Sequence, residues 1–421
     1  MSLSPIKTTL SRILALLLLV SLLAGLTWMN YRFSTQNPGG NDFLARWNGA
    51  RFWVTWHVSP YARPVGLSTQ MMVYNHPADP ARGENENLFV YPFYSLIFFG
   101  PFGGLDFTSA RAIWMSLLEC ALAAAVFLSL RLARWKVSAV EAAGLILFSL
   151  FWYPGARTLI LGQYSGINVL LILGSLLFIQ QNRDGPAGIL LALSTCKPQM
   201  VFLLIPFTLL WGVSNRRWKL LGSLLGAIAL LWVGSWMVLP SWPVEWLRQV
   251  QEYPTYTGRI GTVVDIVSGI LPGARSGFSI LLYLAFSIWL VVTWIHAWGS
   301  GSSRFLWTAL LTLVISNLVA FRTATPHYVA FLPILFMVCQ ALGERYPGYR
   351  RLVTGLTLGS LLVGLWILFL ITVDGNLESG INYVPLPLLS LAALVWLEKT
   401  GYFSRKSGSS VNVKTDGTVS G

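Results

Sequence analysis

Residues 186–213 read PAGILLALSTCKPQMVFLLIPFTLLWGV, two apolar segments that meet at Lys197-Pro198. Each segment is shorter than the roughly 20 residues that a helix needs to cross a bilayer. Proline lacks a backbone donor and disfavours helix in the residue before it, so the chain must break there. Inside a bilayer, a broken helix is tolerated only where it lines a cavity or is buried in protein. The stretch therefore predicts a helical membrane protein with a polar cavity beside Lys197.

The rest of the 421-residue chain agrees, since 55% of it is hydrophobic and only 11% is charged. A soluble domain carries about 25% charged residues. We expect an all-α polytopic fold with about twelve crossings, at residues 12–30, 107–131, 138–153, 166–181, 186–196, 198–213, 218–240, 277–298, 304–320, 326–343, 350–373 and 382–397. These would form one integral membrane domain, residues 1–401. The Ser-, Gly- and Thr-rich residues 402–421 predict a disordered cytoplasmic tail.

The net charge of +13 is unevenly distributed over this topology. Of the 29 Lys and Arg residues, 17 fall on one side and 12 on the other, while the 16 acids divide 5 and 11. This is the positive-inside bias of a multi-pass protein, and it does not resemble a nucleic-acid groove. The pattern predicts cytoplasmic termini, membrane lipids as surroundings and no nucleic-acid partner.

Two long loops lie on the predicted outer side, at residues 32–106 and 241–276. Within the first, residues 42–57 look amphipathic, and the apolar residues 88–105 contain prolines and glycines that suit them poorly to a full span. We expect both stretches to form interfacial elements on the membrane surface.

Asp42 is the first candidate for chemistry, because its carboxylate lies at the predicted water–bilayer boundary. There it could accept a proton from a substrate hydroxyl. The alternative is an ordinary helix cap, since Asp is a favoured capping residue. Arg46 and Tyr91 lie in the same loop and are candidates to line a cavity.

Lys197 could hold a phosphate at the predicted break, or it could be a lysine that snorkels to the surface. The stretch that includes Gln163 and Asn168 offers amides for sugar binding, but a turn and cap explain it equally well. Arg322 and His327 could bind a phosphate, and His327 could also accept a proton. Interfacial anchoring is their alternative role.

Several kinds of site are missing from the sequence. It has no glycine-rich nucleotide loop, no His/Cys metal spacing and no nucleophile elbow. Its three cysteines are scattered among hydrophobic segments, which disfavours a disulfide framework. We therefore expect no metal and no soluble cofactor, and any activated donor should arrive within the membrane.

The order of several short motifs resembles glycosyltransferase family 87, over roughly residues 10–345. The residues that carry the resemblance are Asp42-Phe43, Trp47, Ala50-Arg51, Ser59-Pro60-Tyr61, Tyr91-Pro92-Phe93-Tyr94, Gly162-Gln163, Lys197-Pro198 and Pro326-His327-Tyr328. The family's Tyr-Pro-Pro segment is altered here, because Phe93 replaces its second proline. The resemblance implies a GT-C membrane enzyme that uses polyprenyl-phosphate sugars, often mannose.

Carried over to this chain, the resemblance implies inverting transfer, with Asp42 as the base. Lys197 would contact the donor phosphate, Arg322 and His327 would contact phosphate or acceptor, and Gln163 lies at a matching position. The expected partners are a polyprenyl-phosphate sugar and a glycolipid or glycan acceptor. The expected location is the bacterial inner membrane, with the active site facing outward. A transporter or flippase of lipid-linked sugars is the alternative, since broken helices suit it too. A non-catalytic scaffold is a third possibility.

Overall fold

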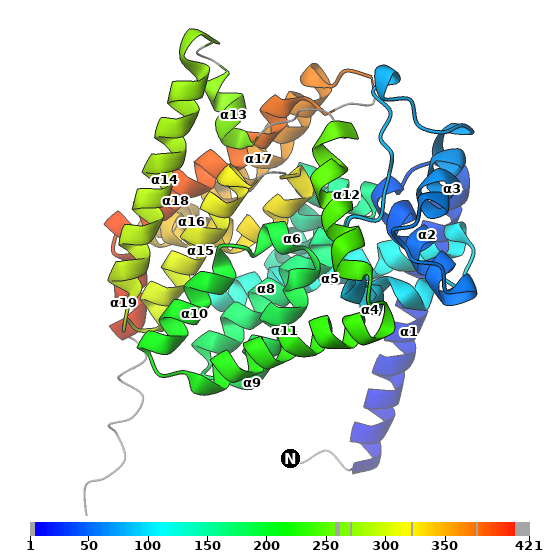
Figure 1. Cartoon of the computed structure of the whole chain (residues 1–421). Coiled ribbons are helices and arrows are strands. Elements are labelled where there is room, and N and C mark those ends of the chain that lie inside the picture. Colours follow the sequence, from blue (N-terminus) through cyan, green and yellow to red (C-terminus); the bar gives the residue numbers. More distant parts are fainter. Residues whose placement is uncertain (1–4, 257–261, 270–271, 321–322, 376–377, 409–421) are drawn as a thin grey trace, which may run out of the picture.

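The computed structural model describes residues 5–256, 262–269, 272–320, 323–375 and 378–408, and the regular elements in them are helices (Figure 1). The first half contains α1 (Pro5–Gln36), α2 (Asn41–Trp56), α3 (Arg63–Tyr74), α4 (Leu96–Phe99), α5 (Phe107–Ala133), α6 (Ala139–Phe151), α7 (Tyr153–Leu161), α8 (Ser165–Gln180), α9 (Asp184–Leu193) and α10 (Leu204–Ser214). The second half contains α11 (Trp218–Val238), α12 (Trp242–Tyr256), α13 (Val263–Ser268), α14 (Arg275–Ala297), α15 (Ser302–Val319), α16 (Leu332–Arg345), α17 (Arg350–Thr372), α18 (Pro385–Lys399) and α19 (Tyr402–Gly408). The predicted all-α membrane fold is confirmed.

The predicted count of twelve crossings is not confirmed. The described residues contain eight helices long and apolar enough to cross a membrane, or nine if α6 and α7, bent by 59°, form one span. The difference comes from α8, α9 and α10, which we counted as separate crossings. At 1.5 Å per residue these helices are only about 24, 15 and 17 Å long, less than the roughly 30 Å of a bilayer core. Each of them is therefore too short to cross the bilayer by itself.

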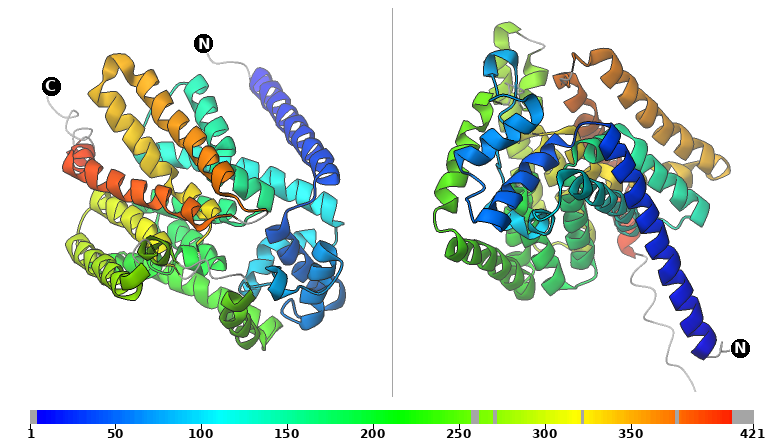
Figure 2. Two further views of the ribbon diagram at one scale, coloured as in Figure 1. Left: turned by 90° about the horizontal axis from the view of Figure 1, so that it is seen from above. Right: turned by 90° about the vertical axis from the view of Figure 1, so that its right-hand side faces the viewer.

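Helix α1 is longer than expected and diverges from the other helices at its N-terminal end (Figures 1 and 2). It continues to Gln36, so the first loop begins at residue 37 and not at residue 32. A polar contact ties α1 to α5, because the Asn30 side-chain amide donates to Ser116 Oγ at 3.1 Å and to Glu119 Oε2 at 2.9 Å. This contact holds α1 against α5 near the point where the first loop starts.

Much of the first loop packs into the protein, and its predicted place at the membrane surface stays a prediction. All side chains of α2 from residue 43 to residue 50 are buried, and so are Phe93, Phe99 and Phe102 of the apolar stretch. The aromatic rings explain this packing: Phe43 stacks on Trp114 of α5 with ring centroids 5.0 Å apart. The loop and α5 therefore share one aromatic core, and this core fixes where α2 begins.

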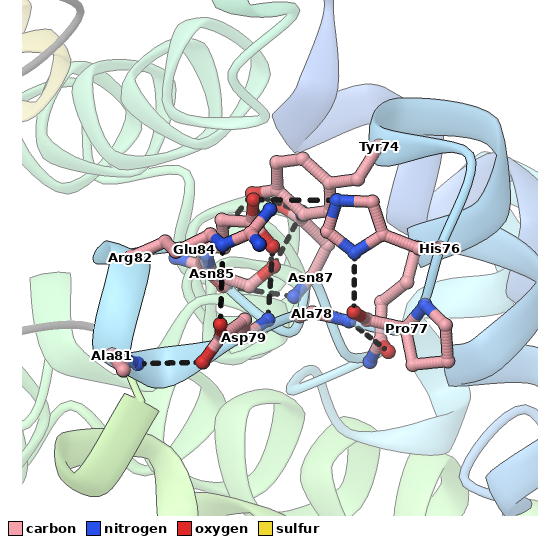
Figure 3. A network of polar contacts seen from close by, with 11 residues as sticks. Tyr74, His76, Pro77, Ala78, Asp79, Ala81, Arg82, Glu84, Asn85 and Asn87 are labelled. Carbon is pink, nitrogen blue, oxygen red and sulfur yellow. Dashed lines mark hydrogen bonds and ion pairs between the residues drawn. The ribbon is translucent and has the colours of Figure 1, made fainter.

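Polar groups close the turn that follows α3 (Figure 3). The Tyr74 hydroxyl accepts from the Asn85 backbone N–H at 3.0 Å, and the Glu84 carboxylate accepts from the Asp79 N–H at 2.9 Å. His76 lies 3.5 Å from the other Glu84 oxygen. These contacts fold the loop tip onto itself.

The second loop holds the first in place through α12. Ser59 donates to the Glu245 carboxylate, and the Trp246 indole N–H donates to the Val90 carbonyl at 3.1 Å. The Gln249 amide donates to the Tyr61 carbonyl at 3.1 Å. The two long loops, distant in sequence, thus form one unit.

The predicted disordered tail is wrong for its first residues, because Tyr402–Gly408 forms helix α19. Tyr402 and Phe403 are buried, and the Tyr402 hydroxyl contacts Gln340 Oε1 at 2.7 Å. The tail is polar on average, but these two aromatic side chains provide enough apolar area to pack its first residues against the protein. Residues 409–421 lie outside the described part of the chain.

Candidate active site

Asp42 lies in the first turn of α2, and its carboxylate is not the helix cap. The capping position belongs to Gly40, whose φ of 73° is the left-handed conformation that glycine tolerates. A Cβ on Gly40 would lie 2.9 Å from the Arg111 side chain, which donates to the Asn37 carbonyl at 2.7 Å. The turn between α1 and α2 is therefore packed on Arg111, and the Asp42 side chain is left to make other contacts.

Gly162 brings the end of α7 against the start of α2. Its φ is +66°, and a Cβ there would lie 2.6 Å from the Cβ of Phe43. The Trp114 indole N–H donates to the Gly162 carbonyl at 2.9 Å, which anchors this close approach. The next residue, Gln163, is thereby placed beside Asp42, and its amide nitrogen donates to Asp42 Oδ2 at 2.7 Å.

Lys197 completes a chain of three side chains. It lies between two short 3₁₀ helices, η4 (Ser194–Cys196) and η5 (Pro198–Met200), with φ −126° and ψ 76°, outside the helical region that the following proline disfavours. Its buried ammonium donates to Gln163 Oε1 at 2.6 Å and to Ser165 Oγ at 3.3 Å. Gln163 thus accepts a hydrogen bond from the ammonium and donates one to the carboxylate. The two charged groups are connected through its amide and not by a direct ion pair.

Arg46 and Tyr91 line the other side of the carboxylate. Arg46, one helical turn after Asp42, approaches Asp42 Oδ1 to 3.6 Å and lies over the Tyr91 ring at 4.5 Å. Burial raises the pKa of the Tyr91 phenol above its ordinary value, and Arg46 offsets this only in part. The phenol therefore stays protonated near neutral pH and can act as a donor.

His327 is buried in the 3₁₀ helix η7 (Thr325–Phe331), close enough to Lys197 for electrostatic interaction. Glu378 fixes this helix, because it accepts from Thr325 Oγ1 at 3.0 Å and from the Tyr153 hydroxyl at 2.7 Å. Asn168 is also buried, with its amide nitrogen 3.5 Å from the sulfur of Met200. Arg322, the remaining candidate, lies outside the described residues.

The sequence did not single out three residues of this region: Ser165, Arg111 and Glu378. Ser165 belongs to the polar stretch that follows Gly162, so its position was visible although its partner was not. Arg111 and Glu378 gave no local signal, because each acts on residues far away in the sequence. Their burial could be recognised only once the helices were packed.

The site combines one carboxylate with nearby cationic groups. The Asp42 side chain is 31% exposed, whereas that of Arg46 is 8% exposed and Lys197 is buried. An incoming hydroxyl could thus reach the carboxylate, and an anion would meet positive charge beside it. No cluster of three His, Cys, Asp or Glu side chains suited to a metal occurs in the described residues. The expected independence from metals stays a prediction.

Comparison with known proteins points to one family. The model of glycosyltransferase family 87 matches residues 89–320, more than half of the chain. An alpha-(1->3)-arabinofuranosyltransferase of Mycolicibacterium smegmatis (strain ATCC 700084 / mc(2)155) is 23% identical over 324 residues, which cover 73% of this chain and 71% of that protein. No solved structure matches the chain. The family match contains Gln163 and Lys197, while Asp42 and His327 lie outside it.

Proposed function

Because the chain belongs to glycosyltransferase family 87, we propose that it moves a sugar from a polyprenyl-phosphate donor to a hydroxyl of a lipid-linked or glycan acceptor. The observation that carries the proposal is the hydrogen-bonded chain Asp42–Gln163–Lys197. It places a carboxylate and a buried cation on either side of one amide, within an integral membrane protein. A cation can bind the phosphate of a lipid-borne donor, and a carboxylate can accept the proton of an acceptor hydroxyl.

Asp42 is the base in this proposal. The acceptor oxygen attacks the anomeric carbon from the face opposite the phosphate, and its proton passes to the Asp42 carboxylate. The Gln163 amide holds one carboxylate oxygen at 2.7 Å, so the other oxygen is directed by Arg46 and is open to the acceptor. Attack from the opposite face inverts the anomeric configuration.

Lys197 and Arg46 stabilise the leaving group. As the new C–O bond forms, the bond between the anomeric carbon and the phosphate oxygen breaks, and polyprenyl phosphate leaves with both electrons of that bond. Positive groups in a site of low dielectric constant stabilise this developing charge more than water could. His327, which interacts electrostatically with Lys197, would contact phosphate or acceptor.

Mannose and arabinofuranose are the two sugars to test. The resemblance described above implies mannose, and the name of the relative from Mycolicibacterium smegmatis specifies arabinofuranose for that protein. The residues named so far would act on the acceptor hydroxyl and on the donor phosphate. Both donors carry that phosphate, so these residues do not distinguish the two sugars. Both donors therefore belong in the first experiment.

The test uses purified protein with polyprenyl-phosphate mannose or polyprenyl-phosphate arabinofuranose, each labelled in the sugar, and a membrane lipid extract as acceptor. We expect one donor to yield a glycosylated lipid of inverted configuration. Asp42→Asn, which keeps the size of the side chain, should lower turnover by about 10²- to 10⁴-fold with donor binding retained. Near-normal turnover of this variant would show that Asp42 is not the base. Sugar uptake into proteoliposomes without a new glycosidic bond would favour the transporter.

A further inference from the structure

A cavity opens between α6 and α17, near the loops that precede both helices. It has a volume of about 460 Å³, and its walls are mainly apolar side chains with three glycines. Among the residues that line it are Glu141, Leu147, Phe151, Arg351, Thr354 and Gly355. Its size falls in the range of ligand pockets, about 300–1,000 Å³. We call this cavity the α6–α17 groove.

The mouth of the groove lies far from the candidate active site, and the residues that line the groove do not belong to that site. Helix α16 begins directly after η7, which carries His327, and ends at Arg345, just before the groove. Its 14 residues span about 21 Å. The α6–α17 groove and the Asp42–Gln163–Lys197 chain are therefore separate places in the molecule.

Two arginines form the mouth of the groove. Arg350 pairs with Glu141 at 3.0 Å, and Arg351 lies 3.8 Å from the same carboxylate. Two positive charges thus meet one negative charge, and the Arg351 side chain is 87% exposed. One turn further along α17, the Thr354 hydroxyl is buried and has no hydrogen-bond partner within the described part of the chain. A second, polar hollow of about 550 Å³ shares Glu141 and both arginines with the mouth.

The depth of the groove matches a single leaflet of the bilayer. Along α17 it extends from Arg350 to Leu362, twelve residues or about 18 Å. Half of a typical hydrocarbon core is about 15 Å. Tyr349, just outside the mouth, is largely exposed, as an aromatic side chain at the level of the lipid headgroups would be.

We propose that the α6–α17 groove binds an anionic phospholipid, with the acyl chains along Leu147, Phe151 and Gly355 and the phosphate at Arg351 and Thr354. The apolar walls fit the chains, and the excess positive charge at the mouth fits the phosphate. A headgroup without net negative charge would not be bound more tightly because of this excess positive charge. The depth of one leaflet favours a phospholipid over a much longer polyprenyl chain. This site is independent of the proposed sugar transfer.

The experiment measures lipid binding to the purified full chain by native mass spectrometry. The probes are dioleoyl phosphatidylglycerol, dioleoyl phosphatidylcholine and undecaprenyl phosphate. The wild-type protein should retain phosphatidylglycerol in preference to phosphatidylcholine. Arg351→Gln should weaken phosphatidylglycerol binding about fivefold, since one basic group near an anionic lipid contributes about that factor. Arg345→Gln, at the end of α16 and not lining the groove, should change binding little.

A second pair of variants fills the groove. Gly355→Leu would extend a side chain into it, and Gly364→Leu is the matched control on the same helix. An added Cβ meets no atom within 4 Å at either position, and Gly364 does not line the groove. Gly355→Leu should abolish retention of the lipid, and Gly364→Leu should not. Equal retention of both phospholipids, equal behaviour of the two leucine variants, or unchanged binding by Arg351→Gln would overturn the proposal. Preferential retention of undecaprenyl phosphate would overturn it too, and would assign the groove to the polyprenyl carrier.

Discussion

Gln163 carries no charge, yet its side-chain amide contacts both the carboxylate of Asp42 and the ammonium of Lys197. We expect Gln163→Leu to lower kcat by about 10²-fold, because a carboxylate that can rotate is misplaced from the acceptor oxygen. KM for the donor should change much less. Gln181→Leu, an exposed position at the end of α8, is the control and should leave both constants unchanged. A purely structural role for Gln163 would instead lower the amount of folded protein and leave kcat intact.

Lys197 allows function to be separated from stability. Burying an ammonium costs free energy, and Lys197→Met keeps the length of the side chain without the charge. We expect this variant to unfold at the same or a higher temperature in detergent, while turnover falls about 10²- to 10³-fold, as for the loss of one group that stabilises transition-state charge. A variant that unfolds more easily and stays active would identify Lys197 as a structural residue.

The sequence predicted these residues unevenly. Lys197 was indicated by physics alone, because a charge before a proline within an apolar segment is too costly to bury unless it faces a polar cavity or a partner. Asp42 looked equally like a cap, and the family resemblance favoured its role as a base. Its contact with Gln163 depends on Gly162 packing against Phe43, a pairing of positions 119 residues apart that no local pattern contains.

At the scale of elements, the bend between α6 and α7 positions Gln163. A Cβ on Gly155 would lie 1.9 Å from the Ser149 carbonyl oxygen, so Gly155→Ala must change the 59° bend. We expect a loss of about 1–3 kcal/mol in stability, typical of overpacking, and a larger relative loss of activity because α7 ends beside Gln163. Thermal unfolding and turnover, compared with Gly144→Ala, measure both effects. Gly144 faces open space, so equal behaviour of the two variants would contradict this account.

For the whole molecule, hydropathy predicted the class of fold but not the number of crossings. Apolar composition marks a segment as buried, and it does not distinguish burial in lipid from burial in protein. Helices α8 and α9 show the ambiguity, because both are apolar and too short to cross a bilayer. The first loop adds a tertiary contact that its sequence did not predict, because Phe43 stacks on Trp114. Only tertiary contacts could decide these cases.

The sidedness of the molecule is the last prediction, and it rests on the distribution of basic residues. In Figure 1 the start of α1 and helix α19 both lie in the lower half of the picture. The positive-inside rule assigns the basic α16–α17 loop to the cytoplasm. In a variant with all three cysteines changed to Ala, we place single cysteines at Met72 of α3, 48% exposed, and at Tyr349, 66% exposed.

A membrane-impermeant maleimide should label Met72→Cys in intact cells, and Tyr349→Cys only after the cells are opened. The result bears on the chemistry, because a site that opens away from the cytoplasm is out of reach of soluble nucleotide sugars, so its donor must cross the membrane on a lipid. The reverse labelling pattern would place Asp42 on the cytoplasmic side and remove this reason for a polyprenyl carrier. Retained glycosyl transfer by each single-cysteine variant is the control that the labelled molecules are folded.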